Sequence, residues 1–353
     1  MIDFSTFQGK RILVTGHTGF KGSWLLAILE RAGAEVKGLS LPPLRGSHFE
    51  QLGFAENNKL NDYVDIRDFN AVSSIVSSFD PQVIFHLAAQ PLVKESYVAT
   101  RETFEVNFMG GVNLLEAVRA SNSLKAFIFI TSDKAYENLE WEWGYRENDR
   151  LGGLDPYSAS KGAVEIAVAS YTRSILQEMP FKVSTVRAGN VIGGGDWAEN
   201  RIVPDIVKAI RAGEPVLLRN PKSTRPWQHV LEPLSGYLLL AEKILNGQEE
   251  IEDSYNFGPD ISETKTVLDV TNKLIEIHGS GVVQISADTS GHHEARLLQL
   301  NCERAKLGLN WKPRWNFDET LARTGEWYRK QSEGVHAKAL TNGHISEYFK
   351  ELA

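Results

Sequence analysis

Short apolar runs alternate with longer amphipathic stretches through the first half of the chain. The runs are rich in Val, Ile, Leu and Phe and predict buried strands at residues 11–15, 35–40, 83–87, 126–131 and 182–188. The stretches between them predict helices, including 104–120 and 157–176. This alternation is typical of an α/β fold, a Rossmann-type doubly wound parallel sheet with helices on both faces. The ligand crevice of such a fold lies beyond the carboxyl ends of the strands, so the segments that follow them should converge there.

The amino-acid composition of the chain changes after residue 188. Glycine, proline and tryptophan concentrate between residues 189 and 228, and shorter periodic segments follow. We therefore expect residues 1–188 to form mainly a Rossmann domain and residues 189–330 mainly a smaller, substrate-binding portion. Residues 331–353 are charged and polar, and we expect a C-terminal tail that either docks as a helix or frays.

Composition and charge exclude several classes of function. The chain has 353 residues, 42% of them hydrophobic, which is enough for a substantial core. Its net charge of -7 argues against general binding to nucleic acid or to acidic membranes. The single cysteine, Cys302, excludes an intrachain disulfide and fits a reducing compartment. No cationic segment precedes an apolar stretch near residue 1, and no apolar run approaches the ~20 residues of a membrane span. We expect a cytoplasmic protein.

A glycine-rich loop joins the first predicted strand to the helix that follows it. Its sequence, Gly16-His-Thr-Gly19-Phe-Lys-Gly22, has the spacing G-x-x-G-x-x-G. Glycines allow a tight turn and a close approach of the backbone to a ligand, and the N-terminus of the next helix favours the negative charge of a pyrophosphate. The loop therefore predicts dinucleotide binding, with contacts from Gly16, His17, Thr18, Gly19, Phe20, Lys21 and Gly22.

A second motif, Tyr157-Ser-Ala-Ser-Lys161, begins the predicted helix 157–176. Its spacing places a phenol and an ammonium one turn apart on the same face. A free tyrosine titrates near ~10, and we expect the nearby cation to lower the pKa of Tyr157 by favouring the phenolate. The pair could then take a proton from a sugar or alcohol hydroxyl while hydride leaves the same carbon. An ordinary amphipathic helix start is the alternative, and the glycine loop favours the catalytic interpretation.

Together the two motifs resemble those of the extended short-chain dehydrogenase/reductase family, whose members mostly modify nucleotide-linked sugars. The resemblance covers roughly residues 10–328 and implies that NAD is the cofactor. It also places a structural asparagine at Asn107. Besides Tyr157 and Lys161, it implies cofactor contacts by segments that follow the strands, namely by Asp65, Ile66, Leu87, Ala88, Ala89, Gln90 and Thr131.

The choice of NAD over NADP rests on the habit of the family and on internal redox cycling. No acidic residue follows the predicted strand 35–40 to bind a ribose 2′-hydroxyl. Ser40 and Arg45 could instead accept the 2′-phosphate of NADP, so the sequence itself leaves this alternative open.

Ser132-Asp133-Lys134 follows the fourth predicted strand. By resemblance, Ser132 hydrogen-bonds the sugar hydroxyl that is oxidised, and two charged residues after it are typical of the family's sugar-nucleotide 4,6-dehydratases. Asp133 would protonate the departing C6 hydroxyl. Lys134 departs from the usual glutamate and is similar to a subgroup that acts on CDP-glucose. The C5 base is then either Lys134, with its pKa lowered from ~10.4, or a water held by Asp133 and Lys134. A sugar 4-epimerase, which would not use Asp133, and a non-catalytic dinucleotide sensor are the alternatives.

The resemblance also implies how the substrate is bound. It places Asn190 on the nucleotide diphosphate and assigns further substrate contacts to Arg201, Arg219, Arg225, His229 and Arg296. His292-His293-Glu294 lacks the spacing of metal ligands, so no metal is expected. Helices 104–120 and 157–176 are apolar enough to pair with copies of themselves, which predicts a homodimer or homotetramer.

Overall fold

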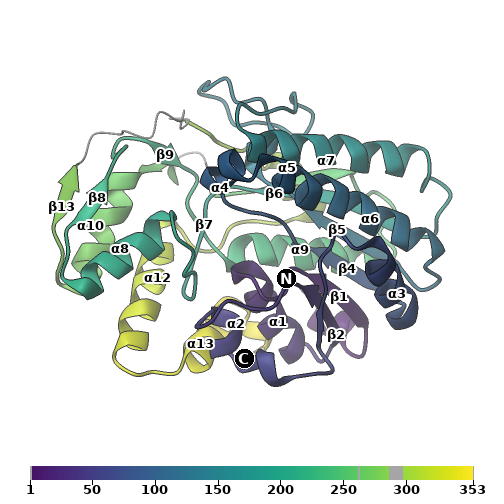
Figure 1. Ribbon diagram of the computed structural model, residues 1–353, viewed down its shortest axis with the longest axis horizontal. Coiled ribbons are helices and arrows are strands. Elements are labelled where there is room, and N and C mark those ends of the chain that lie inside the picture. The colour runs from purple at the N-terminus through teal and green to yellow at the C-terminus, as the bar shows by residue number, and fades with distance from the viewer. Residues whose placement is uncertain (1, 261–262, 286–296, 353) are drawn as a thin grey trace.

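The computed structural model describes residues 2–260, 263–285 and 297–352. At its centre lies a parallel sheet of seven strands in the order β11-β6-β5-β4-β1-β2-β3 (Figure 1). The strands are β1 (Arg11–Thr15), β2 (Glu35–Ser40), β3 (Asn61–Tyr63), β4 (Val83–His86), β5 (Ala126–Ile130), β6 (Lys182–Ala188) and β11 (Ser254–Phe257). The predicted fold class, a doubly wound α/β sheet, is confirmed.

Helices bury both faces of this sheet because its strands are apolar on both sides. On β1, Ile12 and Val14 join a core with helices α1 (Phe20–Arg31) and α9 (Leu231–Leu245). Leu13, which points the other way, joins a core with helices of the opposite face. These are α3 (Phe69–Phe79), α6 (Gly110–Ala117) and α7 (Pro156–Arg173). The sheet is therefore rigidly held, and its carboxyl edge is a stable platform for a site.

The predicted elements agree closely with the structure. Strands β1, β2 and β6 have the predicted bounds, and β4 and β5 end one residue early. The predicted helix 104–120 is a continuous helical stretch of changing pitch. It passes from α5 (Thr100–Phe104) through a π-helical turn (Glu105–Met109) and α6 to a 3-10 turn (Val118–Ala120). The short strands β3 and β11 were not predicted.

A second, smaller core lies to the left in Figure 1. It is built around Trp227 and Trp327 and unites helices α8 (Ile202–Ala212), α10 (Val267–His278) and α12 (Phe317–Ser332) with strand β8 (Val216–Leu218). The same half of the chain also supplies β11 to the large sheet. The division of the chain at residues 188 and 330 stays a prediction.

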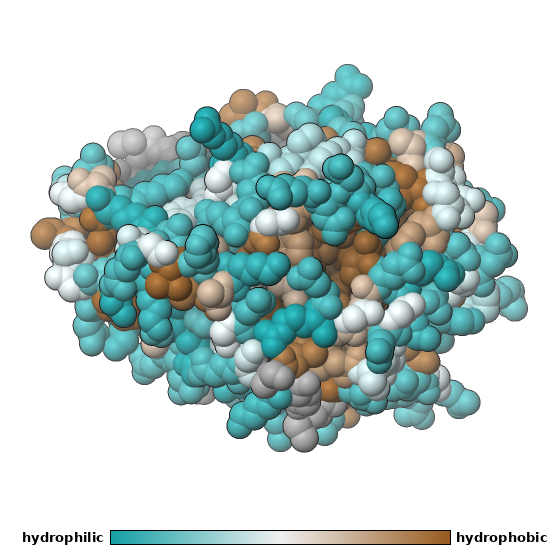
Figure 2. All heavy atoms as spheres, turned by 90° about the horizontal axis from the view of Figure 1, so that it is seen from below, coloured by the Kyte–Doolittle hydropathy of each residue, from teal (hydrophilic) through white to brown (hydrophobic). Residues whose placement is uncertain are grey.

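The remaining elements are short, apart from α13 (Ala337–Tyr348), which packs against α1 and buries Leu340 and Ile345. They are α2 (His48–Gln51), α4 (Val93–Val98), α11 (Glu303–Leu309), β7 (Val191–Ile192), β9 (Thr224–Arg225), β10 (Gln228–His229), β12 (Lys265–Thr266) and β13 (Val283–Ile285). On the face seen from below, apolar surface gathers near the middle and is bordered by polar side chains (Figure 2). No helix among the described residues is long and apolar enough to cross a membrane.

Candidate active site

The glycine loop follows β1 and leads directly into the N-terminus of α1. Gly16 has φ +71°, and a Cβ there would lie 2.6 Å from the backbone nitrogen of Ala88. A Cβ on Gly22 would lie 2.3 Å from the carbonyl oxygen of Gly16, so the helix can pack on the loop only without one. Gly19 is the most open of the three and immediately precedes the first turn of α1. The loop therefore fits a dinucleotide pyrophosphate at the helix N-terminus.

His17 turns away from the ligand side of this loop. Its ring is fully buried, where it bonds Asn61 Oδ1 at 3.0 Å and Ser40 Oγ at 3.1 Å, and Gly38 leaves the space that the ring fills. Burial lowers the pKa of His17 to about 4, so the ring is neutral at pH 7. The predicted cofactor contact of His17 stays a prediction, and the enclosed ring leaves only the backbone of this residue to make it. The Ser40 hydroxyl, which also bonds Thr18 Oγ1 at 2.9 Å, is already engaged and is a poor partner for a 2′-phosphate.

The adjoining wall is built from the segments after β3 and β4. The Asp65 carboxylate is paired with Arg67 at 2.6 Å, and the Ile66 side chain is buried against α6. Their predicted cofactor contacts stay predictions. Asn107 accepts from the backbone nitrogen of Gln90 at 2.8 Å and donates to its carbonyl at 3.1 Å. It also donates to Ser160 Oγ at 2.9 Å, which ties the segment after β4 to α7. This is the structural role that the resemblance implied for Asn107.

The turn after β5 carries a buried carboxyl group with an unsatisfied oxygen. Ser132 accepts from the backbone nitrogen of Lys134 at 3.2 Å and so caps the 3-10 helix Asp133–Ala135. Its hydroxyl lies 3.0 Å from Asp133 Oδ1, while Oδ2 is buried without a partner among the described residues. Burial raises the pKa of Asp133, against the nearby charge of Lys134 and the Ser132 bond. Burial thus favours the protonated carboxyl, the form that can act as an acid.

Helix α7 brings Tyr157 and Lys161 to the same place. Asp155 caps the helix by accepting from the backbone nitrogen of Ser158 at 2.9 Å, and Lys161 Nζ lies 5.9 Å from the centre of the Tyr157 ring. The Tyr157 phenol lies near Ser132, whose hydroxyl favours the phenolate. The predicted convergence of these three side chains is therefore seen in the structure.

The expected effect of Lys161 on the phenol is not seen. Burial raises the pKa of Tyr157 to about 12, although the nearby Ser132 favours the phenolate. Burial and the charge of Lys21 also lower the pKa of Lys161 to about 8. The prediction that Lys161 lowers the pKa of Tyr157 is therefore wrong, because the cost of burying the phenolate outweighs the groups that favour it, which are Ser132 and Arg201.

Other cations surround this group. Lys21, from the glycine loop, has its pKa lowered to about 8 by burial and then by the charge of Arg201. Arg201 is paired with Asp196 at 2.9 Å, and its charge favours the Tyr157 phenolate. The charge of Arg225 in turn lowers the pKa of Asp133. The glycine loop, the turn Ser132–Lys134 and two of the arginines predicted for substrate, Arg201 and Arg225, thus share one positively charged site, which suits an anionic substrate.

Comparison with known proteins agrees with this geometry. The model of the GDP-mannose 4,6 dehydratase family matches residues 13–324. The chain belongs to this family. A curated relative, CDP-glucose 4,6-dehydratase of Salmonella typhimurium, is 43% identical over 99% of this chain and 98% of its own.

Solved structures of relatives have the same fold as this 4,6-dehydratase family member. The UDP-glucose 4-epimerase of Thermus thermophilus, solved as a complex with NAD, is 27% identical with a TM-score of 0.74 and covers 90% of this chain and 99% of its own. The dTDP-glucose 4,6-dehydratase of Bacillus anthracis, also with NAD, is 23% identical with a TM-score of 0.76 and covers 92% and 98%. The resemblance drawn from the motifs is confirmed.

The remaining predicted substrate residues of this family member differ in their surroundings. His229 is fully buried, with ring centroids 5.7 Å from Trp24 and 4.8 Å from Trp315, and its Nδ1 accepts from the backbone of Leu231. This enclosure contradicts the predicted substrate contact of His229. Arg219 is exposed just after β8, and Asn190 is half-buried just after β6. Arg296 and the His292–Glu294 stretch lie outside the described residues.

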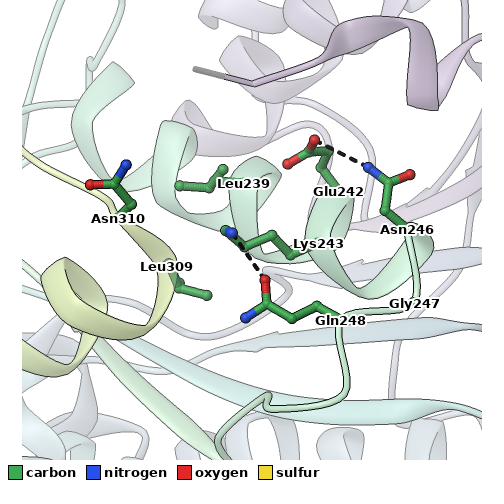
Figure 3. A pocket seen from close by; sticks show the side chains of 8 residues that line it. All are labelled: Leu239, Glu242, Lys243, Asn246, Gly247, Gln248, Leu309 and Asn310. Atoms are coloured by element: carbon green, nitrogen blue, oxygen red, sulfur yellow. Dashed lines mark hydrogen bonds between the residues drawn. The ribbon is translucent and has the colours of Figure 1, made fainter.

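A pocket beside the C-terminal end of α9 is lined by none of the predicted site residues (Figure 3). Its polar groups bond one another, because Lys243 donates to Gln248 at 3.0 Å and Asn246 donates to Glu242 at 3.2 Å. We therefore assign the chemistry of this family member to the edge of the large sheet.

Sequence reasoning missed three buried residues that bear on the site. Glu165 and Arg187 form an ion pair beneath the catalytic turn, and Tyr237 on α9 is near enough for Asp133 to raise its pKa further. Glu165 follows Lys161 by one turn on the same helix face, a spacing that could have indicated it. Tyr237 lies within an apolar helix, and nothing in its sequence context marks it.

Proposed function

We propose that this family member is an NAD-dependent CDP-glucose 4,6-dehydratase. It would convert CDP-D-glucose to CDP-4-keto-6-deoxy-D-glucose and water. The observation that carries this proposal is the carboxyl oxygen of Asp133 that is buried without a partner among the described residues, next to a serine whose hydroxyl favours the phenolate of Tyr157. The 43% identity to the Salmonella typhimurium enzyme supports the choice of CDP-glucose.

The cofactor would be held by the glycine loop and by the N-terminus of α1. Gly16, Gly19 and Gly22 leave the required backbone space, and the engaged hydroxyl of Ser40 favours NAD over NADP. Bound NAD supplies the acceptor and donor of one hydride, so the overall loss of water is redox-neutral.

The protein's own groups would move the protons. Tyr157 takes the C4 hydroxyl proton, and the nearby hydroxyl of Ser132 favours the phenolate that accepts it. Because burial raises the pKa of Tyr157 to about 12, the group starts as a phenol and must first release its own proton to solvent. The surrounding cations favour the phenolate, which then accepts the C4 proton. The new C4 ketone makes the C5 hydrogen acidic. The C5 hydrogen leaves as a proton. Asp133 protonates the C6 hydroxyl, which leaves as one water. Hydride then returns to C6.

We propose that the C5 proton is removed at the position of Lys134, by the amine or by a water that it holds with Asp133. Lys134 is half-buried, and its charge acts on the Asp133 carboxyl. Exchange of the C5 hydrogen with deuterated solvent should therefore slow strongly in Lys134→Met. Exchange at the wild-type rate in that variant would exclude both the Lys134 amine and the held water as the C5 base.

A direct assay separates dehydration from its alternatives. The protein is incubated with CDP-glucose and, in parallel, with dTDP-glucose, UDP-glucose and GDP-mannose, and the alkaline ultraviolet absorbance of a 4-keto-6-deoxy sugar is followed. We expect the signal with CDP-glucose. A signal only with another nucleotide would refute the cytidine preference. A stereoisomer without the chromophore would indicate a 4-epimerase, and no product with any of the four would favour the sensor.

We also propose a homodimer formed through the outer faces of the π-helical turn and α7, which contact each other in one chain. Met109 is 46% exposed and Ile166 60% exposed there, which is unusual for such large apolar side chains. Light scattering should give the mass of two chains, and Ile166→Glu should reduce it to one. A wild-type mass of one chain would refute the proposal.

The single, buried Cys302 supports a reducing, cytoplasmic location.

A further inference from the structure

A buried ion pair lies beneath the catalytic turn. Arg187 on β6 binds Glu165 on α7 through two hydrogen bonds, Nε to Oε1 at 2.7 Å and Nη2 to Oε2 at 2.8 Å. The two side chains are only 3% and 2% exposed. Such a bidentate pair is geometrically specific, and breaking it would leave an uncompensated charge in the core.

The same pair holds both ends of the turn that carries the catalytic residues. At the start of the turn, the hydroxyl of Thr131 donates to Glu165 Oε1. At its end, Arg187 Nη1 donates to the hydroxyl of Tyr136 at 2.6 Å, and the guanidinium lies 4.8 Å from the centre of the Tyr136 ring. The residues between these two anchors are Ser132, Asp133, Lys134 and Ala135.

The anchoring extends to the strand at the edge of the sheet. The Tyr136 hydroxyl donates to Asn256 Oδ1 on β11 at 2.8 Å. Asn256 in turn donates to the backbone carbonyls of Tyr145 and Asn301 at 2.9 and 3.0 Å. Every side chain in the series Glu165–Arg187–Tyr136–Asn256 is buried, so the position of the turn is set by groups that have few other ways to bond.

Glu165 is also one helical turn beyond Lys161. Its charge favours the ammonium of Lys161, against burial and the charge of Lys21. Two uncharged side chains of the same volume, in place of the Glu165–Arg187 ion pair, could hold the core together as well. Such an uncharged pair could not bind the hydroxyls of Thr131 and Tyr136 while placing a charge that acts on Lys161.

We propose that Glu165, acting through Arg187, Thr131 and Tyr136, is a positioning residue that keeps the Ser132–Asp133–Lys134 turn aligned with Tyr157 and Lys161. Glu165 does not touch the reacting atoms. Its loss should therefore slow the chemical steps more than it weakens substrate binding. This inference rests on the proposed dehydration for its kinetic part only.

The test compares three single substitutions in the full chain. Glu165→Gln removes the charge but keeps the shape, and Tyr136→Phe removes only the hydroxyl that anchors the end of the turn. Tyr255→Phe is the matched control, because Tyr255 is equally buried and its hydroxyl accepts from the backbone of Glu252 at 3.0 Å, away from the turn. Tyr136→Phe leaves no buried charge unpaired and decides the question if Glu165→Gln does not fold.

Two measurements are made on each variant. In steady-state turnover of CDP-glucose, we expect kcat to fall about 100-fold in Glu165→Gln and about 10-fold in Tyr136→Phe, with KM within twofold and Tyr255→Phe unchanged. Without substrate, amide hydrogen exchange at residues 132–136 should be faster in the first two variants and unchanged in the control. Wild-type kcat together with wild-type exchange at 132–136 in both would overturn the inference. If the wild type does not convert CDP-glucose, the proposed function fails, and the exchange measurement still decides the positioning role.

Discussion

Acid should loosen the packing of α13, because buried histidines meet where this helix contacts α1. His344 on α13 lies 6.2 Å from the ring of Trp24 and 5.7 Å from that of His229, and its Nδ1 is buried without a hydrogen-bond partner among the described residues. Burial lowers the pKa of His344 to about 4, although the charges of Glu347 and Glu326 favour the imidazolium.

The magnitude follows from the two pKa values. In the unfolded chain the histidine titrates near 6.5, so below that pH the unfolded state binds a proton that the folded state refuses. The contribution to stability is present above pH 6.5 and is lost as the pH falls towards 4. The difference between the folded and unfolded pKa values corresponds to about 3.4 kcal/mol of unfolding free energy in full. About 2 kcal/mol of this is lost by pH 5.

The assay is urea unfolding at pH 7.5 and pH 5 for the wild type, His344→Gln and His336→Gln. His336 is exposed at the start of the same helix and makes no side-chain capping bond. Between the two pH values, the wild type should lose about 2 kcal/mol more unfolding free energy than His344→Gln and about as much as His336→Gln. An equal loss in the wild type and His344→Gln would refute the reasoning, since both would then release the same number of protons on folding.

Three further predictions concern the site. Gly22→Ala should abolish NAD binding in calorimetry, because its Cβ would lie 2.3 Å from the Gly16 carbonyl oxygen. Gly343→Ala is the control and should leave the affinity for NAD unchanged, because Gly343 has open space around it in α13. Equal affinities of the two variants would contradict the loop geometry. Asp133→Asn should slow dehydration about 10²–10⁴-fold while C4 oxidation continues, seen as accumulated NADH and 4-ketone, and an unchanged rate would exclude Asp133 as the acid. Tyr157→Phe should abolish turnover while NAD still binds, and near wild-type turnover would remove Tyr157 from the mechanism.

Much of the fold could be predicted because most of its strands are buried on both faces. Such strands are continuous apolar runs, and the runs at β1 and β5 are clear in the sequence. Strands β3 and β11 were missed because they are short and contain polar residues. Asn256 of β11, for example, is buried only because its side chain bonds three segments that are remote in sequence.

In the site, too, some features could be predicted from the sequence and others could not. Spacing places Tyr157 and Lys161 on one helix face, and the family resemblance implied that Ser132 belongs to the same site, so their meeting could be predicted. The pKa of Tyr157 could not, because it depends on how deeply the phenol is buried by other parts of the chain. His229 illustrates the same limit, since only the packed rings of Trp24 and Trp315 reveal that it faces the core.

The place of β11 at the end of the large sheet has a consequence for biosynthesis. A nascent polypeptide that has reached the end of β6 still lacks the neighbour that covers this strand's outer edge. Until β11 leaves the ribosome, that edge presents free backbone N–H and C=O groups, which can pair with other growing chains. A fragment that stops at residue 188 would keep the same open edge permanently, and we expect it to aggregate even though every strand of the nucleotide-binding motif is present.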